Sequence, residues 1–191
     1  MIAATLVLLG STKIFDGKTL KGWEVVGGGT WTVERGVLKG ECKKTDDQGI
    51  LLYEKPVKDF TARLQFKISG GNSGFYFRAE RLAEQPLVKG MQAEIDAIED
   101  VAGIWETAGR GWVFKPDAAL HATAKFKPGE WSRLDVSAIG THYTVKLNGK
   151  TITDIDDPKG RLEGRVALQL HGGMDMTVEF KDVWLEHKGG Q

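Results

Sequence analysis

A short run of carboxylates near the middle of the chain has residue types that can break glycosidic bonds. The segment GMQAEIDAIED, residues 90–100, carries Glu94, Asp96 and Glu99 in the order E-x-D-x-x-E, with Gln92 just before them. Two carboxyl groups about 5 to 5.5 Å apart can serve as nucleophile and acid on a sugar acetal. A carboxylate whose pKa is raised can instead remove a proton from carbon. The strand that carries these residues decides which chemistry is open to them.

The alternation in this segment predicts a β-strand that separates Glu99 from the other polar residues. Successive side chains of a strand point to opposite faces. Gln92, Glu94 and Asp96 therefore share one face, and the apolar residues between them share the other. Glu94 and Glu99 are five positions apart and face opposite ways unless a β-bulge lies between them. A mechanism like that of retaining endoglucanases, with Glu94 as nucleophile and Glu99 as acid, would need that bulge.

Two other segments also combine an apolar face with a polar, titratable one. In NSGFYFRAE the polar face presents Tyr76 and Arg78, and in VALQLHG it presents Gln169 and His171. A merely solvated face would favour lysine, serine and threonine. If the three strands are neighbours in one sheet, their polar residues form a single cluster, which we expect to be the functional site. Arg78 could instead be a surface partner of Glu94, and His171 a capped residue at a strand end.

Aromatic residues elsewhere in the chain could supply flat surfaces for a sugar ring. Trp105, Trp112 and Tyr143 are the candidates, because aromatic rings offer a large apolar face. Each of them has packing in the core as its alternative role. The other tryptophans belong to apolar patterns and are expected to pack in the interior. A polar cluster with such rings beside it would suit an oligosaccharide or glycoside as substrate.

Alternating apolar and polar residues recur along the chain and predict an all-β fold. The clearest strands are residues 60–69, 131–139, 142–148, 166–172 and 176–187. Asn148 and Gly149, between two alternating runs, predict a tight hairpin. The stretch from Arg81 to Lys89 is expected to be a loop or a single helical turn. About a dozen short strands at even spacing predict a two-sheet antiparallel β-sandwich, a jelly roll of the concanavalin or glucanase type.

Length and charge limit the organisation and the partners of the chain. With 191 residues, we expect one jelly-roll domain over residues 12–191. Residues 1–11 contain an apolar run that is too short to span a bilayer; they are either the remnant of a leader peptide or an edge strand. The 26 basic and 26 acidic residues balance, so phosphate backbones and anionic lipid exert no net attraction. We expect no nucleic-acid partner and no membrane span.

Two acidic loops and one histidine are the candidates for holding a cation. Asp46–Asp47 and the segment 154–157 offer oxygen ligands that suit calcium, although solvated turns explain them more simply. His171 with Glu94 or Asp96 could bind one divalent ion, either calcium or a transition metal. The chain has no C-x-x-C, H-x-x-x-H or H-E-x-x-H pattern. A divalent cation is thus an option, and no other cofactor is indicated.

Motifs along most of the chain resemble the 3-keto-disaccharide hydrolase domain family. They span roughly residues 14–187 and are IFDGKTLKGWEV, WTVERGVLKG, FTARLQFKISGGNSGFYFR, GMQAEID, GIWETAGRGWV, PGEWSRLDVSAIGTHYTVKLNG and GRVALQLHGGMDMTVEFKDVWLE. The resemblance implies a concanavalin-like jelly roll, periplasmic or secreted in bacteria, that acts on 3-keto-glycosides. The family often has the order G-x-E-x-Q in the strand of GMQAEID, whereas here Gln92 precedes Glu94.

The resemblance also implies a reaction for the clustered residues. A keto group at C3 acidifies the proton at C2, so the C1–O bond can break by elimination through an enolate, and water then adds. Glu94 or Asp96 would be the base for C2, and His171 the acid for the leaving oxygen. Arg78 or a metal ion would stabilise the enolate. The expected catalytic residues are Glu94, Asp96, His171 and Arg78, and the expected substrate-binding residues are Tyr76, Gln92, Gln169, Trp105 and Trp112.

Two other functions fit the same residues. Jelly rolls host lectin-like sugar-binding modules as readily as enzymes, so the cluster could bind a sugar without turnover. The E-x-D-x-x-E strand could also belong to a retaining endo-β-glucanase. Turnover separates the three functions, because only the 3-keto-glycoside hydrolase requires an oxidised sugar and the binding module cleaves no substrate.

Overall fold

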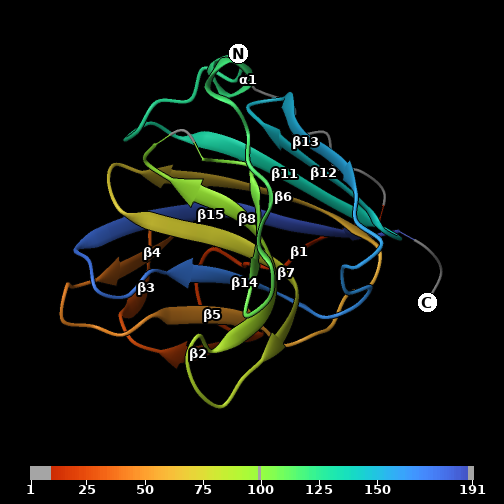
Figure 1. Ribbon diagram of the computed structural model, residues 1–191. Helices are drawn as coiled ribbons and strands as arrows, with labels where there is room; N and C mark the ends of the chain where they lie inside the picture. Colours follow the sequence, from red (N-terminus) through yellow and green to blue (C-terminus); the bar gives the residue numbers. More distant parts are fainter. Residues whose placement is uncertain (1–9, 99, 189–191) are drawn as a thin grey trace.

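The protein is a sandwich of two antiparallel β-sheets (Figure 1). The computed structural model describes residues 10–98 and 100–188. The first sheet has the order β13 (Lys150–Asp156), β12 (His142–Leu147), β11 (Ser132–Ile139), β6 (Phe60–Ile68), β15 (Met176–His187), β4 (Val37–Cys42) and β3 (Thr30–Glu34), and β1 (Ser11–Lys13) pairs with β15. The second has the order β10 (Gly111–Phe114), β9 (Ile104–Thr107), β8 (Val88–Asp96), β7 (Asn72–Arg81), β14 (Arg165–Leu170), β5 (Gly49–Tyr53) and β2 (Trp23–Gly27). The predicted all-β sandwich of jelly-roll type is confirmed.

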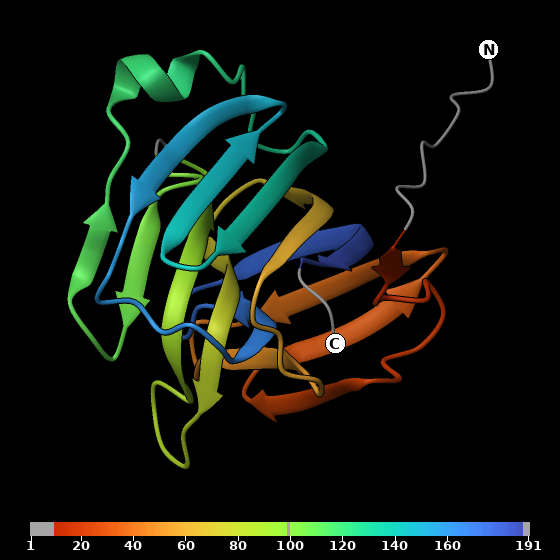
Figure 2. The ribbon, with the colours of Figure 1, turned by 90° about the vertical axis from the view of Figure 1, so that its right-hand side faces the viewer.

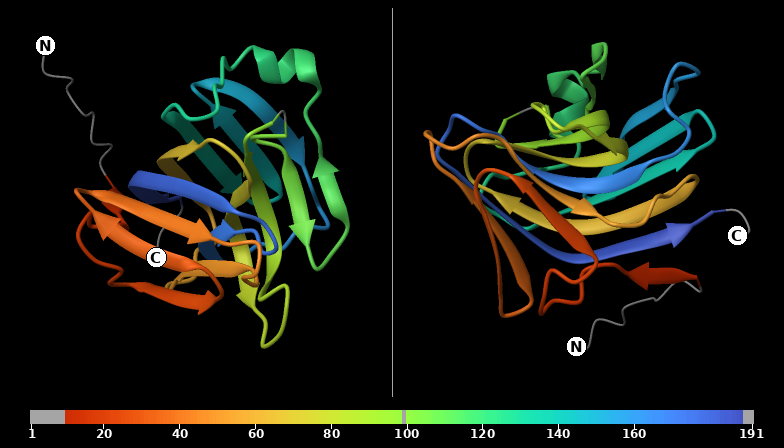
Figure 3. Two further views of the ribbon diagram at one scale, coloured as in Figure 1. Left: turned by 90° about the vertical axis from the view of Figure 1, so that its left-hand side faces the viewer. Right: turned by 90° about the horizontal axis from the view of Figure 1, so that it is seen from below.

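The two sheets enclose an apolar core that follows from the alternation along the strands; Figure 3 shows the layers from two directions. In β6, every second side chain from Phe60 to Ile68 is buried, and the side chains between them are partly exposed. The opposite sheet meets them with its own apolar face, and the rings of Phe60 and Phe77 lie edge to face at 6.1 Å. Burial of one large apolar side chain contributes about 1.5–3 kcal/mol. The apolar face therefore fixes the register of each strand.

The topology places β14, which is distant in sequence, beside the consecutive strands β7 and β8. β7 pairs with β8 on one side and with β14 on the other. The expectation that the three polar segments form neighbouring strands is therefore confirmed. Phe75, Ala93 and Leu168 of these strands belong to the core between the sheets. In the regular parts of these strands, the residues between the core residues consequently point to the outer face of the second sheet.

Part of that outer face is covered by the connection between β7 and β8. The segment 82–87 contains no helix and is the predicted loop. Its Leu87 packs with Val26 and Ile50 in a small apolar cluster outside the main core. The loop thus covers the face over β5 and β2, and the face over β8, β9 and β10 is left for polar side chains.

Two local elements show how the sequence sets the chain direction. Asn148 and Gly149 join β12 to β13 with φ angles of 51° and 82°, as a tight two-residue hairpin turn requires. The short helix α1, Ala118–Ala122, was not predicted, because five residues are too few for a helical period. It begins where the Asp117 side chain accepts a hydrogen bond from the backbone N–H of Leu120 at 2.7 Å. Figure 2 shows it in green, beyond β10.

The prediction for the N-terminal segment 1–11 falls largely on residues 1–9, which lie outside the described part of the chain. At its inner end, Ser11 begins β1, which pairs with β15. Across residues 10–98 and 100–188, no helix has the length and apolar character needed to cross a membrane.

Candidate active site

The outer face of the second sheet holds a pocket of about 300 Å³. Adjacent strands β14, β7, β8, β9 and β10 supply most of its lining. The lining residues are Gln48, Asn72, Tyr76, Gln92, Glu94, Asp100, Trp105, Thr107, Trp112, Gln169 and His171. Most of the predicted site residues are therefore brought together, and the exceptions are Asp96 and Arg78.

Glu94 is a buried carboxyl group in the lining of this pocket, only 6% exposed. Its Oε1 accepts a hydrogen bond from Nε2 of Gln92 at 2.7 Å, and its Oε2 accepts one from Nδ2 of Asn72 at 3.3 Å. The pKa of Glu94 is raised to about 8, chiefly by burial and also by the charges of Asp96 and Asp100, while the hydrogen bonds from the two amides oppose the rise. A general base is most effective when its pKa lies near the working pH.

Asp96 lies at the end of β8, just outside the pocket lining. It is buried, and its Oδ1 accepts a hydrogen bond from the backbone N–H of Ile98 at 3.0 Å. Burial raises the pKa of Asp96 to about 6, and the charge of Asp100 adds to the rise. Its position lets Asp96 act on Glu94 through its charge. Of the two predicted bases, the structure favours Glu94.

Two buried glutamines in the lining carry unpaired carbonyl oxygens. Gln92 is 3% exposed and Gln169 is 5% exposed. Within the described residues, no group donates a hydrogen bond to Oε1 of either side chain. Their amino groups are engaged, with Glu94 in the case of Gln92 and with the Tyr76 hydroxyl at 3.3 Å in the case of Gln169. An unpaired buried acceptor costs about 1–3 kcal/mol, a cost that a hydrogen from a bound hydroxyl group would remove.

The Tyr76 side chain is fully buried, so its ring presents no exposed face to the pocket. Its ring packs in the outer apolar cluster with Ile50 and Ala167. Its hydroxyl oxygen lies 2.9 Å from Oγ1 of Thr107. Burial raises the pKa of Tyr76 well above its usual value, so the phenol stays protonated at neutral pH. As a predicted substrate-binding residue, Tyr76 can therefore act through its hydroxyl group and not by stacking on a sugar ring.

Trp105 and Trp112 form one wall of the pocket from the β9–β10 hairpin. The two residues are paired across the hairpin, and their rings lie edge to face with centroids 5.4 Å apart and an interplanar angle of 88°. Each is 36% exposed. Exposed aromatic rings at the rim of a polar pocket suit the predicted stacking of a sugar ring.

His171 lies on another wall of the pocket, one residue beyond β14. Its Nδ1 is 2.8 Å from the carbonyl oxygen of Gly172, and its backbone N–H donates to the carbonyl of Asn72 at 3.3 Å. A ring that donates through Nδ1 leaves Nε2 to accept or deliver a proton. His171 is thus both a strand-end residue held by the backbone and a lining residue of the pocket.

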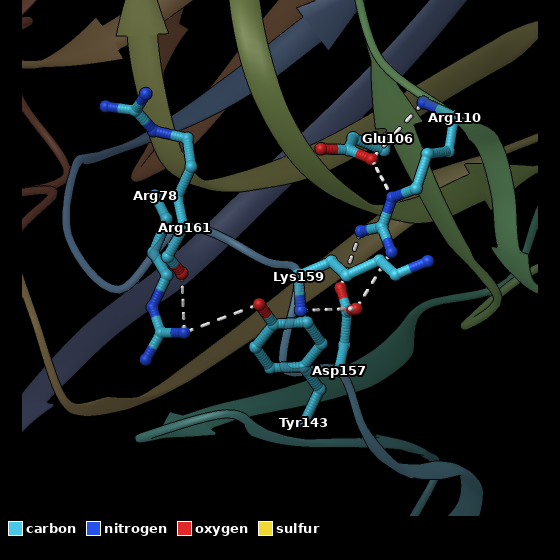
Figure 4. A network of polar contacts seen from close by, with 7 residues as sticks. All are labelled: Arg78, Glu106, Arg110, Tyr143, Asp157, Lys159 and Arg161. Atoms are coloured by element: carbon cyan, nitrogen blue, oxygen red, sulfur yellow. Dashed lines mark hydrogen bonds and ion pairs between the residues drawn. The ribbon is translucent and has the colours of Figure 1, made fainter.

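The expectation that Arg78 faces the cleft is wrong. The pairing of β7 with both neighbours shifts register around Arg78, whose φ is 52°. This β-bulge turns the side chain away from the pocket and buries it completely. Its guanidinium donates to the carbonyl of Arg161 at 2.8 Å and to the Tyr143 hydroxyl at 3.4 Å (Figure 4). The guanidinium also lies 3.4 Å from a carboxylate oxygen of Asp59.

The contact between Arg78 and Tyr143 shows that Tyr143 is not the exposed stacking platform that was considered. The ring of Tyr143 is fully buried, lies edge to face with Phe77 at 5.2 Å, and has the Arg78 guanidinium over it at 5.4 Å. Tyr143 is therefore a core residue and not a platform for a sugar.

Four lining residues were not selected from the sequence. Asn72 has the same parity as Tyr76 in β7, and Thr107 has the same parity as Trp105 in β9. Alternation could therefore have identified both. Gln48 and Asp100 lie in loops, where alternation gives no information about direction.

The acidic loops proposed for calcium use their carboxylates within the chain. His142 pairs with Asp154 at 2.8 Å and with Asp156 at 3.2 Å. Asp157 binds Arg110, and Asp46 accepts a backbone hydrogen bond from Lys43. Residues 10–98 and 100–188 contain no group of three or more His, Cys, Asp or Glu side chains placed to hold a metal ion. Asp154 and Asp156 lie in β13 and not in the expected loop, and a cation at either acidic cluster or between Glu94 and His171 stays a prediction.

Comparison with known proteins places this site in a family context. A family model described as a 3-keto-alpha-glucoside-1,2-lyase-like domain matches residues 10–186. A curated relative, the 3-keto-disaccharide hydrolase of Bacteroides thetaiotaomicron, is 34% identical over 86 residues. That match covers 40% of this chain and only 30% of the relative.

Solved structures share the fold at lower identity. A protein of Parabacteroides distasonis, proposed to be a glycosyl hydrolase, superposes with a TM-score of 0.69 at 21% identity over 94% of both chains. A carbohydrate-binding module of Bacillus subtilis superposes with a TM-score of 0.64 at 22% identity, covering 86% of this chain and 95% of the module. At these identities the likeness shows the fold alone.

Proposed function

The chain belongs to the family of 3-keto-alpha-glucoside-1,2-lyase-like domains, and we propose that it cleaves the glycosidic bond of a 3-keto-glycoside. The observation that carries the proposal is Glu94, a buried carboxyl group with a pKa of about 8 in a polar pocket. Such a group can take a proton from carbon, provided that a neighbouring carbonyl group has made that proton acidic. An ordinary glycoside has no such proton, whereas a 3-keto-glycoside has one at C2.

The reaction would proceed in two balanced steps. In the first, Glu94 takes the C2 proton, the C1–O bond breaks, and a C1–C2 double bond forms next to the C3 carbonyl. His171 gives a proton to the leaving oxygen. In the second, a water oxygen adds to C1 and His171 takes the proton that the water loses. C2 regains a proton from Glu94, so Glu94 and His171 both return to their starting protonation states.

The enolate oxygen needs a hydrogen-bond donor that Arg78 does not supply. Tyr76 and Thr107 carry the two hydroxyl groups of the lining, 2.9 Å apart, and these groups are neutral donors. Donors already fixed in place stabilise developing charge without reorganisation. We assign this role to the Tyr76–Thr107 pair, while the free oxygens of Gln92 and Gln169 would accept hydrogen bonds from sugar hydroxyl groups.

The test is turnover of matched oxidised and unoxidised sugars. We expect 3-keto-trehalose or a 3-keto-glucoside to release 3-keto-glucose, and the unoxidised sugars and a β-glucan to remain intact. Cleavage of β-glucan would instead support the endoglucanase alternative, which also depends on Glu99, outside the described residues. Dialysis against EDTA in the same assay tests the predicted cation: loss of turnover, restored by calcium or a transition metal, would support it.

A second candidate function is carbohydrate binding without turnover. It is favoured by the likeness to the carbohydrate-binding module and by the exposed tryptophan pair. Binding of the 3-keto-glycoside without release of 3-keto-glucose would favour this function over catalysis.

A further inference from the structure

The turn of the β9–β10 hairpin carries an arginine that is bound on two sides. The Arg110 side chain donates through Nε to the carboxylate of Glu106, and its backbone N–H donates to the same carboxylate at 3.2 Å. Its two terminal nitrogens donate to Oδ1 and Oδ2 of Asp157 at 2.8 and 2.7 Å. Figure 4 shows Arg110 between these two carboxylates. The fork-like, two-point contact is the strong geometry for an arginine and a carboxylate.

Asp157 is a fixed partner, anchored in the loop that follows β13 of the first sheet. It is 5% exposed. Its backbone N–H donates to the carbonyl of Thr141 at 2.9 Å, and its own carbonyl accepts from the backbone N–H of Gly160 at 3.1 Å. The hydrogen bonds from Arg110 hold the pKa of Asp157 below its usual value. The guanidinium therefore ties the edge of the second sheet to a rigid point on the first.

The hairpin that Arg110 holds is short, and the sheet supports it from one side only, through the pairing of β9 with β8. β9 and β10 have four residues each, and β10 is the edge strand, paired only with β9. The pairing also shifts register between Trp112 and Phe114. β9 is held by its pairing with β8, whereas β10 has no strand on its outer side, so the contact from the turn across to the other sheet is a second anchor for the hairpin.

Both tryptophans of the pocket wall lie next to the residues of this contact. Trp105 directly precedes Glu106, and Trp112 follows Arg110 by two positions. Both rings lie against glycines: a Cβ on Gly111 would be 3.2 Å from the Trp105 ring, and one on Gly103 would be 2.9 Å from the Trp112 ring. Because the rings lie directly against the backbone, a shift of the hairpin shifts them with it.

We propose that Arg110, through Asp157, is a positioning residue that fixes Trp105 and Trp112 as the binding wall for the sugar. This rests on the proposed function, because it takes a glycoside as the occupant of the pocket. Glu94 lies on β8 and His171 beyond β14, so neither depends directly on the Arg110–Asp157 contact. Loosening that contact should weaken substrate binding and leave the chemical step intact.

The first experiment measures hydrogen exchange of the hairpin amides, residues 104–114, in the protein without sugar. In Arg110→Gln and in Asp157→Asn we expect exchange at least about threefold faster than in the wild type. The matched control is Arg81→Gln, which removes a similarly exposed arginine paired with Glu24 at 3.1 Å outside the hairpin. Unchanged exchange in both hairpin variants, with folding verified by circular dichroism, would overturn the proposal.

The second experiment measures steady-state kinetics with 3-keto-trehalose. We expect KM to rise about three- to tenfold in Arg110→Gln while kcat stays within about twofold, with partial recovery in Arg110→Lys. Faster exchange with an unchanged KM, or a loss confined to kcat, would contradict positioning. If the wild type shows no turnover, the proposed function fails; quenching of tryptophan fluorescence by the same sugar then measures affinity, and an unchanged affinity in Arg110→Gln overturns the positioning role.

Discussion

Gly74 of β7 and Gln92 of β8 are diagonal neighbours across the two strands, and the glutamine side chain occupies the space where a side chain of residue 74 would lie. A Cβ at Gly74 would be 2.4 Å from Cγ and 2.5 Å from Nε2 of Gln92. Real Cβ atoms do not approach other atoms so closely. The glycine therefore allows Gln92 to reach the carboxylate of Glu94.

Gly74→Ala should displace Gln92 and disturb the hydrogen bond that orients Glu94. We expect kcat/KM for a 3-keto-glycoside to fall by about tenfold or more. The control is Gly70→Ala in the preceding turn, where a Cβ would meet nothing within 4 Å. Full activity in Gly74→Ala would mean that Gln92 does not position the base.

Glu94→Gln should remove the base and yet stabilise the fold above neutral pH. Loss of a general base lowers kcat by about 10²- to 10⁴-fold. The pKa of Glu94 rises from 4.5 to about 8 on folding, so the folded state holds the proton more tightly. Below pH 4.5 this group costs the fold nothing, and its cost grows as the pH rises to about 8. At pH 7 the linkage amounts to about 3 kcal/mol.

The measurement for Glu94→Gln combines kinetics with thermal unfolding at pH 5 and pH 8. Wild type should lose stability between the two pH values, and the variant should lose much less. The remaining pH dependence should include Asp96, whose pKa of about 6 acts with the same sign over a lower range. Equal losses in both proteins would show that Glu94 ionises normally in the folded state.

Asp96→Asn should shift the pH dependence of the reaction toward acid. Because the base must be ionised, kcat/KM should rise with pH up to about pH 8 in the wild type. The charge of Asp96 raises the pKa of Glu94, so its removal should lower that pKa and move the rising limb to lower pH. Asn72→Ala, which removes a hydrogen bond to the carboxylate, should move the limb the opposite way. A limb that stays in place in both variants would separate Glu94 from the observed titration.

His171→Ala should matter in proportion to the basicity of the leaving group. A sugar alcohol needs a proton as it departs, so we expect about a hundredfold loss of kcat with 3-keto-trehalose. Nitrophenolate leaves without that help, and the loss with nitrophenyl 3-keto-glucoside should be only a few-fold. Equal losses with both substrates would assign His171 a role other than that of the acid.

Alternation along the strands carried most of what the sequence could reveal about the site. It separated Gln92 and Glu94 from the core residues between them, and it did the same for Tyr76 and Gln169. The pairing of β7 with β14, almost a hundred residues apart, could only be assumed, since patterns do not encode which strands are neighbours.

The misplacement of Arg78 has a physical cause that the pattern does not contain. Alternation assumes a regular strand. One residue in a left-handed conformation, at a β-bulge, turns its side chain to the face opposite to the one that alternation predicts. Arg78 is that residue, with a φ of 52°. Its neighbour across the bulge, Gly164, has no side chain to oppose the close approach of the Arg78 backbone, where a Cβ would come within 2.3 Å. The sequence signs of the bulge are thus glycines elsewhere in the chain, Gly164 just before β14 and Gly90 in β8.

The inward turn of Arg78 also sets the selectivity of the pocket for the charge of its sugar. Among the described residues that line the pocket, Glu94 and Asp100 are acidic and none is lysine or arginine. A uronic acid or a sugar phosphate would place its negative charge beside Asp100, and beside the Glu94 carboxylate as well once the pH approaches about 8, in a partly desolvated site where repulsion is strong. We therefore expect the pocket to discriminate against anionic sugars, so that a 3-keto-glucuronide should compete poorly with its uncharged counterpart.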